Sequence, residues 1–302
     1  MASRVIVTGG FGFIGQNLVR ALNNQGIRPG IIERNIELPE QPLDYSYALL
    51  ADDIIYEMSH GQLPKVDVIY HLGAITDTTC TDSELLLKYN TLFSKNLIRL
   101  AQANGTRVVY ATTAGYLKGQ EIFAHNRYAE SKLEVDEWVQ RNGYTNVVGL
   151  QLFNVLGPGE SRKGHMASKA YKAFYELRDS GRVDLFKPDK LQRYGPLRRD
   201  FVYVDDVVDV FLAAAESNTN GIIQVGTGHP RTWEELASVC IQSCGDRCCW
   251  VGYVEPPDDF QTYQTFSQAD LANLQKLMPA GWLPRDLESG IQSYYDYLRE
   301  TK

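Results

Sequence analysis

Residues 5–15 read VIVTGGFGFIG, and residues 16–22, QNLVRAL, continue with the apolar spacing of an amphipathic helix. A β-branched run, a glycine-rich turn and a helix in this order are typical of a unit that binds a dinucleotide. The glycines let the backbone turn tightly and approach a pyrophosphate, and the helix N-terminus offers N–H donors to the phosphates. We therefore assign seven residues to the cofactor: Gly9, Gly10, Phe11, Gly12, Phe13, Ile14 and Gly15.

The second predicted strand, Gly30–Ile32, is followed by an acidic and a basic residue, Glu33 and Arg34. An acidic residue here accepts hydrogen bonds from the adenosine ribose hydroxyls of NAD, whereas an arginine favours the 2′-phosphate of NADP. The two residues alone leave both cofactors open, and either charge could be a solvated loop charge. A third apolar run, Tyr47–Leu50, precedes Asp53, which we expect beside the adenine.

A fourth predicted strand, Val66–Tyr70, leads into a turn of small residues. Asn90 lies in the middle of a later helix, where a buried amide needs hydrogen-bonding partners. A cofactor contact and a local structural role are both open for Asn90. The turn itself we expect to face the cofactor through Leu72, Gly73 and Ala74.

A fifth predicted strand, Val108–Ala111, leads to Thr113, at the edge where open parallel sheets hold their ligands. Tyr128 and Lys132 follow on a predicted helix, and residues four apart share a helix face. An ammonium beside a phenol favours the phenolate and lowers a pKa that is about 10 in isolation. We therefore expect Tyr128 to exchange protons near neutral pH. The Tyr-x-x-x-Lys pattern is no more frequent than chance predicts. Its position after a strand that ends in Thr113 is what supports a catalytic role.

The composition favours a metabolite as the partner. The chain has 302 residues with 37 Asp and Glu against 30 Lys and Arg, which offers no basic surface for nucleic acid or an anionic membrane. No apolar run is long enough to span a bilayer or resembles a signal-peptide core, and five cysteines suit a reducing compartment. We expect a cytoplasmic protein. Cys240, Cys244 and Cys248 lack the distant second pair of a zinc site, so we expect no metal.

The glycine turn, Thr113, Tyr128 and Lys132 together resemble the active-site pattern of the extended short-chain dehydrogenase/reductase superfamily. That resemblance implies an α/β fold, with a Rossmann-like doubly wound parallel sheet and a smaller, discontinuous α/β substrate-binding domain. The regular alternation of strands and helices breaks down at the Phe-Asn-Val-x-Gly-Pro motif of residues 153–158. We expect residues 1–152 to form the dinucleotide-binding domain, segments near 199–228 to return to it, and 153–302 to bind mainly substrate.

Three segments, 163–168, 199–204 and 263–271, are similar to the branch of that superfamily that epimerises ADP-heptose. By that resemblance Tyr128 and Lys163 are two opposed catalytic acid/bases, and Thr113 and Lys132 assist Tyr128. Inverting a carbon needs two such groups, because the proton donor must serve the face opposite to the one oxidised. The residues that the resemblance implies for the substrate are Thr78, Asn154, Lys163, His165, Met166, Arg199 and Tyr263, the last two at its pyrophosphate.

The implied activity is redox-neutral epimerisation of a nucleotide sugar, ADP-glycero-manno-heptose above others, by a homo-oligomer. Aligning the second strand with the family without a gap puts Arg34 at the acidic position, which favours NADP, whereas a one-residue gap favours NAD. A 4-epimerase, a dehydratase and a non-catalytic NAD(P)-sensing protein are the alternatives. Ala114 follows Thr113 where dehydratases carry an acidic residue, which disfavours elimination. The shortened segment before Tyr128 and Gln151, at a position where relatives carry arginine, leave the sugar and nucleotide open.

Overall fold

The computed structural model describes residues 4–118, 121–122, 126–187, 197–245, 248–256 and 264–301. Its centre is a seven-stranded parallel sheet in the order β13-β8-β5-β4-β1-β2-β3. This arrangement confirms the predicted doubly wound fold. The strands are β1 (Val5–Thr8), β2 (Gly30–Glu33), β3 (Tyr47–Leu50), β4 (Val68–His71), β5 (Arg107–Thr113), β8 (Val147–Leu152) and β13 (Gly221–Val225).

Strand β1 shows why this sequence forms the middle of a sheet with two covered faces. Successive side chains of a strand point to opposite faces, and all four residues of β1 are buried. Val5 and Val7 belong to one apolar cluster, whereas Ile6 belongs to another. Strand order reverses beside β1, which lies between β2 and β4. A crevice for a ligand is expected at that point, beyond the carboxyl ends of the strands.

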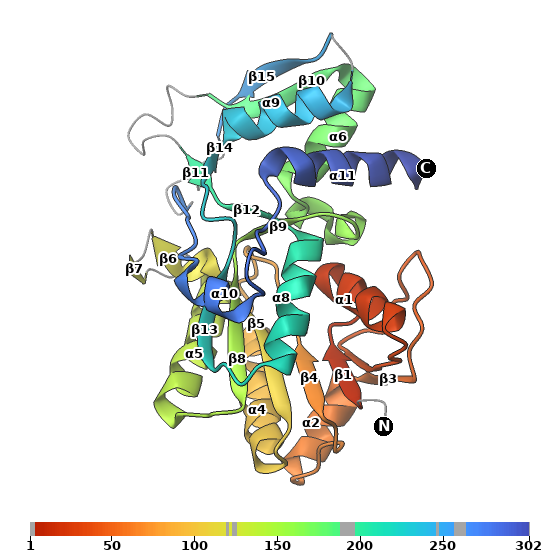
Figure 1. Ribbon diagram of the computed structural model, residues 1–302, viewed down its shortest axis with the longest axis vertical. Helices are drawn as coiled ribbons and strands as arrows, with labels where there is room; N and C mark the ends of the chain where they lie inside the picture. The colour runs from red at the N-terminus through yellow and green to blue at the C-terminus, as the bar shows by residue number, and fades with distance from the viewer. Residues whose placement is uncertain are drawn as a thin grey trace.

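Helices cover both faces of the sheet (Figure 1). On the face of Val5 and Val7 lie α1 (Phe13–Asn24) and α8 (Val204–Glu216), which pack against each other. The opposite face is covered by α2 (Ala51–Ser59), α4 (Phe93–Ala103) and α5 (Arg127–Asn142). The larger lobe also contains four short helical elements: α3 (Ser83–Leu86), η1 (Leu87–Leu92), η2 (Ala114–Tyr116) and α10 (Ala272–Leu277).

A smaller lobe lies beyond one end of the sheet, at the top of Figure 1. Its core cluster is formed mainly by α6 (Lys169–Ser180), α9 (Trp233–Cys244) and α11 (Leu287–Glu300). The strands β10 (Arg182–Phe186) and β15 (Trp250–Val254) pair in parallel beside these helices. Shorter elements are β6 (Leu117–Lys118), β7 (Glu121–Ile122), β9 (Asn154–Leu156), η3 (Glu160–Met166), β11 (Arg198–Arg199), β12 (Phe201–Tyr203) and β14 (Arg231–Thr232).

The buried Asp200 joins segments that are far apart in the sequence. Its carboxylate accepts hydrogen bonds from the backbone N–H groups of Thr227, Gly228 and Ala269 at 2.7, 2.9 and 2.9 Å. A carboxylate with several backbone donors replaces the hydrogen bonds that it loses with water. The chain that follows β13 is therefore fastened to the segment that begins β12. Among the described helices, none is both long and apolar enough to cross a membrane.

Candidate active site

One cavity of about 1850 Å³ runs along the carboxyl ends of the central strands and under the smaller lobe. Both lobes contribute to its wall, as expected for a site at the point where strand order reverses. Twenty of the residues that the sequence assigned to a site line it: Gly9, Phe11, Gly12, Phe13, Ile14, Gly15, Glu33, Arg34, Leu72, Gly73, Ala74, Thr78, Thr113, Tyr128, Lys132, Asn154, Lys163, His165, Met166 and Arg199.

Three of the predicted residues do not line the cavity. Gly10 packs against Ile31, whose side chain a Cβ on Gly10 would meet at 2.7 Å. Asp53 is exposed in the first turn of α2, whereas Ala51, two residues earlier, lines the cavity. The Asn90 amide is buried and holds the backbone N–H of Ile75 at 2.7 Å, so it acts on the turn and not on the cavity. Tyr263 lies outside the described residues.

The glycine turn fits a pyrophosphate. Gly9 has a φ of 70°, which favours glycine, and its N–H donates to the Ile32 carbonyl oxygen at 2.8 Å. A Cβ on Gly15 would lie 1.9 Å from the Gly9 carbonyl oxygen, so only glycine allows helix α1 to begin this close to the turn. Gly12 is the N-cap of α1 and provides no side-chain hydrogen bond. The N–H groups at the start of the helix are therefore available to an anion.

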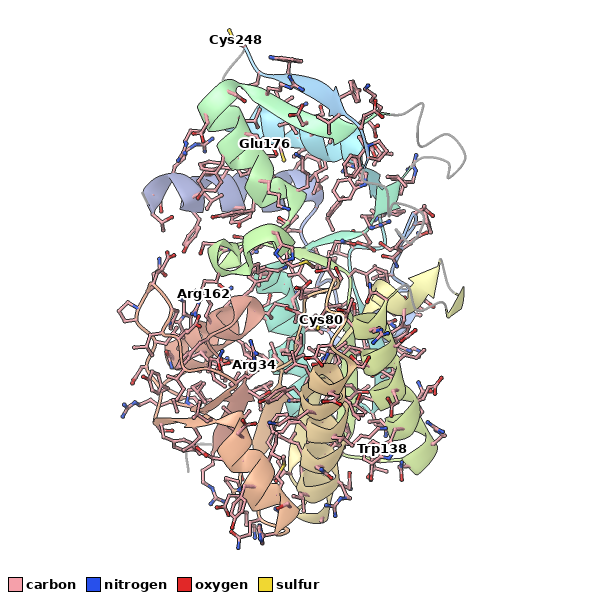
Figure 2. All side chains as sticks on the ribbon, turned by 180° about the vertical axis from the view of Figure 1, so that it is seen from behind. Arg34, Cys80, Trp138, Arg162, Glu176 and Cys248 are labelled. Atoms are coloured by element: carbon pink, nitrogen blue, oxygen red, sulfur yellow. The ribbon has the colours of Figure 1, made fainter. Side chains whose placement is uncertain are left out.

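Glu33 ends β2 with its carboxylate directed at this turn. Its Oε1 accepts a hydrogen bond from the Phe11 N–H at 2.6 Å. Burial raises the pKa of Glu33 to about 7, although the Phe11 hydrogen bond and the nearby Arg162 act in the opposite direction. Arg34 is exposed (Figure 2), whereas Arg162 donates to the Phe11 carbonyl oxygen at 3.1 Å. Sequence reasoning missed Arg162, which comes from η3 and carries no local motif.

Tyr128, Lys132 and Thr113 meet where β5 ends against α5. The Lys132 ammonium donates to the Ala111 carbonyl oxygen at 2.9 Å, and burial lowers its pKa to about 8. Loss of water raises the pKa of Tyr128 to about 12, while a hydrogen bond with the Thr113 hydroxyl lowers it. The expectation that Lys132 lowers the phenol pKa is therefore wrong for this arrangement, because the ammonium is directed at the strand.

Asp136 lies one helical turn beyond Lys132 and was missed by the sequence reasoning. Its buried carboxylate accepts hydrogen bonds from the hydroxyls of Tyr110 at 2.8 Å, Thr112 at 2.5 Å and Tyr116 at 2.6 Å. Burial raises its pKa to about 6, and the charge of Asp136 in turn raises the pKa of Lys132. The four-residue spacing from Lys132 was the signal that could have found it.

The turn after β4 is fixed by a chain of hydrogen bonds through a buried histidine. The Gly73 N–H donates to Thr8 Oγ1 at 2.9 Å, and Thr8 Oγ1 lies 2.7 Å from His71 Nδ1. His71 Nε2 lies 2.7 Å from Ser94 Oγ, which donates to the Asn90 carbonyl oxygen at 2.5 Å. Burial lowers the pKa of His71 to about 3, so the ring is neutral. No pattern in the sequence assigned a role to His71.

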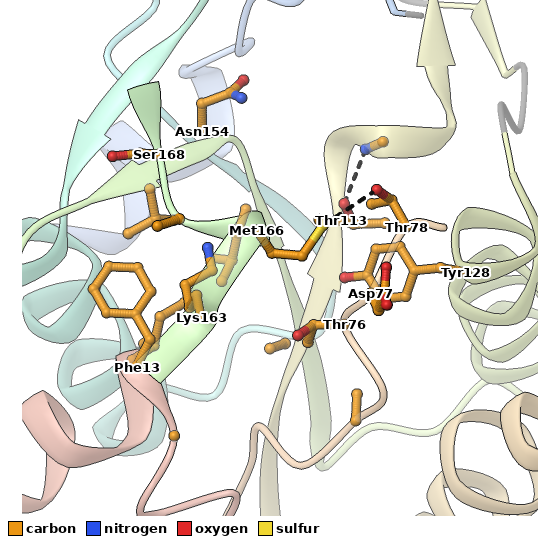
Figure 3. A pocket seen from close by; sticks show the side chains of 18 of the residues that line it. Phe13, Thr76, Asp77, Thr78, Thr113, Tyr128, Asn154, Lys163, Met166 and Ser168 are labelled. Atoms are coloured by element: carbon orange, nitrogen blue, oxygen red, sulfur yellow. Dashed lines mark hydrogen bonds between the residues drawn. The ribbon is translucent and has the colours of Figure 1, made fainter. Parts of the chain in front are cut away.

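Lys163 reaches the cavity from the other lobe. Its Nζ lies 5.1 Å from the centre of the Phe13 ring, at the start of α1, and burial lowers the pKa of the ammonium. Met166, on the same segment, extends toward the opposite wall, where its sulfur lies 3.8 Å from Thr78 Oγ1. In Figure 3, Met166 lies between Lys163 and Tyr128. The two predicted acid/bases thus come from different lobes and face a shared space.

One further contact crosses the cavity, and it joins the same two segments as the contact of Met166 with Thr78. His165 Nε2 lies 3.6 Å from Asp77 Oδ1, across the same gap that Met166 spans. Cys240 is buried in α9, and Cys248 is exposed at the far tip of the smaller lobe (Figure 2). Within the described ranges, no three His, Cys, Asp or Glu residues are grouped to hold a metal ion.

A parallel sheet with a glycine turn, a Tyr and Lys pair at a strand end and a second lobe over the cavity defines a dinucleotide-dependent enzyme of the Rossmann type. The family model described as "NAD dependent epimerase/dehydratase family" matches residues 5–226. The chain belongs to this family.

The relatives agree over the whole length. An ADP-L-glycero-D-manno-heptose-6-epimerase of Alkalilimnicola ehrlichii is 34% identical, and the match covers 98% of both chains. An enzyme of the same name from Brachyspira hyodysenteriae is 31% identical over 98% of both chains. The crystal structure of the Helicobacter pylori ADP-L-glycero-D-manno-heptose-6-epimerase is 26% identical, with a TM-score of 0.81 over 99% of this chain and 96% of that one.

Proposed function

We propose that this protein is an ADP-glycero-manno-heptose 6-epimerase that works through a ketone intermediate with a bound dinucleotide. The observation that supports it most is the placement of Tyr128 and Lys163 in one cavity, on walls that belong to different lobes (Figure 3). A reaction that inverts a hydroxyl-bearing carbon needs proton exchange at two faces of the sugar. Matches of 31–34% identity to enzymes with this activity support the choice of sugar nucleotide.

A nicotinamide in this cavity would accept a hydride from the sugar carbon and later return it. Tyr128 must be in its phenolate form to take the proton of the sugar hydroxyl as the carbon becomes a ketone, and the hydrogen bond with the Thr113 hydroxyl favours that form because it lowers the pKa of the phenol. The Lys132 ammonium is fastened to the Ala111 carbonyl oxygen, on the strand that ends in Thr113. After the ketone presents its other face, the Lys163 ammonium gives a proton to the oxygen as the hydride returns. No net oxidation results, so no external reductant is consumed.

The substrate's diphosphate requires positive charge and hydrogen-bond donors on the second lobe. Arg199 is buried at the cavity wall in β11, and Asn154 lies at the start of β9. We propose that Arg199 binds the pyrophosphate, as the sequence predicted, and that Thr78, His165 and Met166 enclose the sugar. Residues 1–152, with segments near 199–228, then hold the dinucleotide, and 153–302 hold mainly the sugar nucleotide. Self-association of the chain stays a prediction.

For the cofactor we propose NAD as the preferred form. Glu33 ends β2 with its carboxylate at the glycine turn, where it can accept hydrogen bonds from the adenosine ribose hydroxyls. A 2′-phosphate at this point would face that carboxylate and Glu37, which pairs with Arg162 at 3.2 Å. The sequence favoured NADP because of Arg34. The exposed Arg34 and Arg162 are the two positive charges available to the 2′-phosphate of NADP.

The proposal is tested by incubating the purified protein with ADP-D-glycero-D-manno-heptose and following the C6 epimers by NMR. Appearance of the L-glycero epimer without net change in the dinucleotide is the expected result. Parallel incubations with UDP-glucose and UDP-N-acetylglucosamine test the 4-epimerase alternative. Turnover of a UDP-sugar in place of the heptose would overturn the choice of substrate, and release of dinucleotide without turnover of any sugar would favour a sensor.

A further inference from the structure

The segment that carries Lys163 is closed into a loop by one buried carboxylate. Glu160 is fully buried, and its Oε1 accepts hydrogen bonds from the Gly157 N–H at 3.1 Å and the Ser168 hydroxyl at 2.9 Å. Its Oε2 accepts a hydrogen bond from the Ser168 N–H at 2.5 Å. Both ends of the loop are thus held by the same side chain. The Ser168 hydroxyl also caps α6 by accepting from the Tyr171 N–H.

Glu160 precedes Lys163 by three residues in the same short helix. Both residues belong to η3, a 3₁₀ helix, and side chains three residues apart are eclipsed in that conformation. Lys163 must leave water to reach the cavity, and it is partly covered by the Phe13 ring. An ammonium in such surroundings loses its proton easily unless a negative charge lies nearby.

The charges around the pair come from three elements. Within η3 itself, Glu160 raises the pKa of Lys163, whereas Lys172 on α6 lowers it. Tyr171 on α6 and Tyr294 on α11 are the phenols on which the charge of Glu160 acts. Burial raises the pKa of Glu160, and Lys163 is the first of the groups that lower it again. Of these described residues, Glu160 is the one whose negative charge raises the pKa of Lys163.

We propose that Glu160 is a positioning residue for Lys163: it closes the loop of residues 157–168 and places a carboxylate in the same short helix as the Lys163 ammonium. The inference rests on the proposed role of Lys163 as the second acid/base. Glu160 touches neither sugar nor cofactor in this account and acts through the lysine. Its carboxylate has two separable effects, one through its hydrogen bonds to Ser168 and one through its charge.

Trace acetylation measures the second effect directly. The protein is exposed to limiting acetic anhydride over a range of pH, and modification of Lys163 is quantified by mass spectrometry against Lys276, an exposed lysine on α10. Glu160→Gln should move the midpoint of Lys163 acetylation to lower pH by about one unit, because the negative charge that raises the pKa of Lys163 is removed. Glu57→Gln, a neutralised exposed carboxylate on α2, should leave the midpoint unchanged.

Ser168→Ala separates the charge from the clamp. It removes the Ser168 hydroxyl from Glu160 and from the α6 cap but keeps the carboxylate, so the thermal midpoint should fall while the Lys163 acetylation midpoint stays. An unchanged midpoint in a folded Glu160→Gln protein overturns the proposal, as does an equal shift in Ser168→Ala. If Glu160→Gln does not fold, Glu160→Asp withdraws the charge by one methylene and must shift the midpoint in the same direction by less.

The acetylation result is independent of the proposed reaction. If Lys163→Ala epimerises the sugar at the parent rate, the second acid/base role fails, but the coupling of Glu160 to Lys163 is still measured by the chemistry of the lysine. If the acetylation midpoint does not respond to Glu160, the coupling of Glu160 to Lys163 fails. The acid/base role of Lys163 is then still tested by the activity of Lys163→Ala. The two failures therefore give different patterns in the same set of proteins.

Discussion

The Lys132 ammonium is bound to the Ala111 carbonyl oxygen at 2.9 Å, two residues before Thr113 on the same strand. This contact fixes α5 against the carboxyl end of β5 and so holds the Tyr128 phenol at the Thr113 hydroxyl. In this structure the Lys132 ammonium is bound to the strand. A bound sugar or nicotinamide ribose would compete with the Ala111 carbonyl oxygen for the ammonium. The arrangement gives each group a role that substitutions can separate.

Tyr128→Phe removes the phenol hydroxyl and leaves the ring in place. We expect the rate of epimerisation to fall by about 10²–10⁴-fold, the range typical of a general acid/base. Bound dinucleotide and the melting temperature should stay close to the parent values, because the ring stays in place. Only the hydroxyl that bonds Thr113 at the cavity wall is lost. Steady-state rates and the dinucleotide released on denaturation measure both. A variant with parent activity would remove Tyr128 from the chemistry.

Lys163→Ala should stop epimerisation and spare the first half-reaction. Tyr128 still removes the hydroxyl proton, so a single turnover with the sugar nucleotide should show reduced nicotinamide by its fluorescence. The product epimer should not accumulate, because no group serves the second face. Lys276→Ala, at an exposed site on α10, is the matched control and should behave as the parent. Loss of the half-reaction together with epimerisation would mean that Lys163 binds substrate and does not transfer a proton.

The dependence of activity on pH should reflect Lys132. Its pKa is lowered to about 8 by burial, so the ammonium is lost, and activity falls, as pH rises through about 8. Asp136→Asn removes the charge that raises this pKa, and the basic limb of the kcat profile should move to lower pH. Glu137→Gln alters the exposed neighbour on the same helix and should leave the limb in place. A limb that does not respond to Asp136 would assign it to another group.

The stability of the cofactor-free protein should reflect Glu33. Its pKa is raised from 4.5 to about 7 in the folded state, so between these values the folded protein holds a proton that the unfolded chain has released. The free energy of unfolding should therefore fall as pH rises through about 7. Glu33→Gln should flatten this part of the profile in urea denaturation. A profile in Glu33→Gln with the parent slope would contradict the assignment.

Cofactor preference is tested at the same residue. The parent should bind NAD more tightly than NADP in calorimetry, because the Glu33 carboxylate is bonded to the glycine turn, whereas Arg34 is exposed. Glu33→Ser should weaken NAD and improve NADP, since the repulsion of a 2′-phosphate is removed. Arg34→Ala is the matched neighbour and should change NAD affinity little. Tighter binding of NADP by the parent would support the interpretation that the sequence favoured.

Local patterns in the sequence predicted the parts of the site that are built within one strand and its next helix. The glycine turn, Thr113 and Tyr128 are of this kind, because spacing along the chain fixes their distance in space. The resemblance to a known family added Lys163, which no local spacing connects with Tyr128.

Contacts between distant segments could not be read from the sequence. The contact of Arg162 with the Phe11 carbonyl oxygen joins residues 151 positions apart and depends on how the two lobes meet. The direction of the Tyr128 pKa was also wrong, since burial outweighs a charge whose orientation only the structure defines. Asp53 was expected beside the adenine because it follows a strand. In the structure it is an exposed residue in the first turn of α2.

Closure of the central sheet has a consequence for the newly made chain. Strand β8 is buried along its whole length and pairs with β13, which is encoded some seventy residues later. At typical rates of synthesis this interval lasts roughly 4–15 seconds, during which the apolar edge of β8 has no partner. Unpaired apolar edges recruit other chains. The edge of β8 therefore stays open to other chains until β13 has been made, and any slowing of synthesis between the two strands lengthens that time.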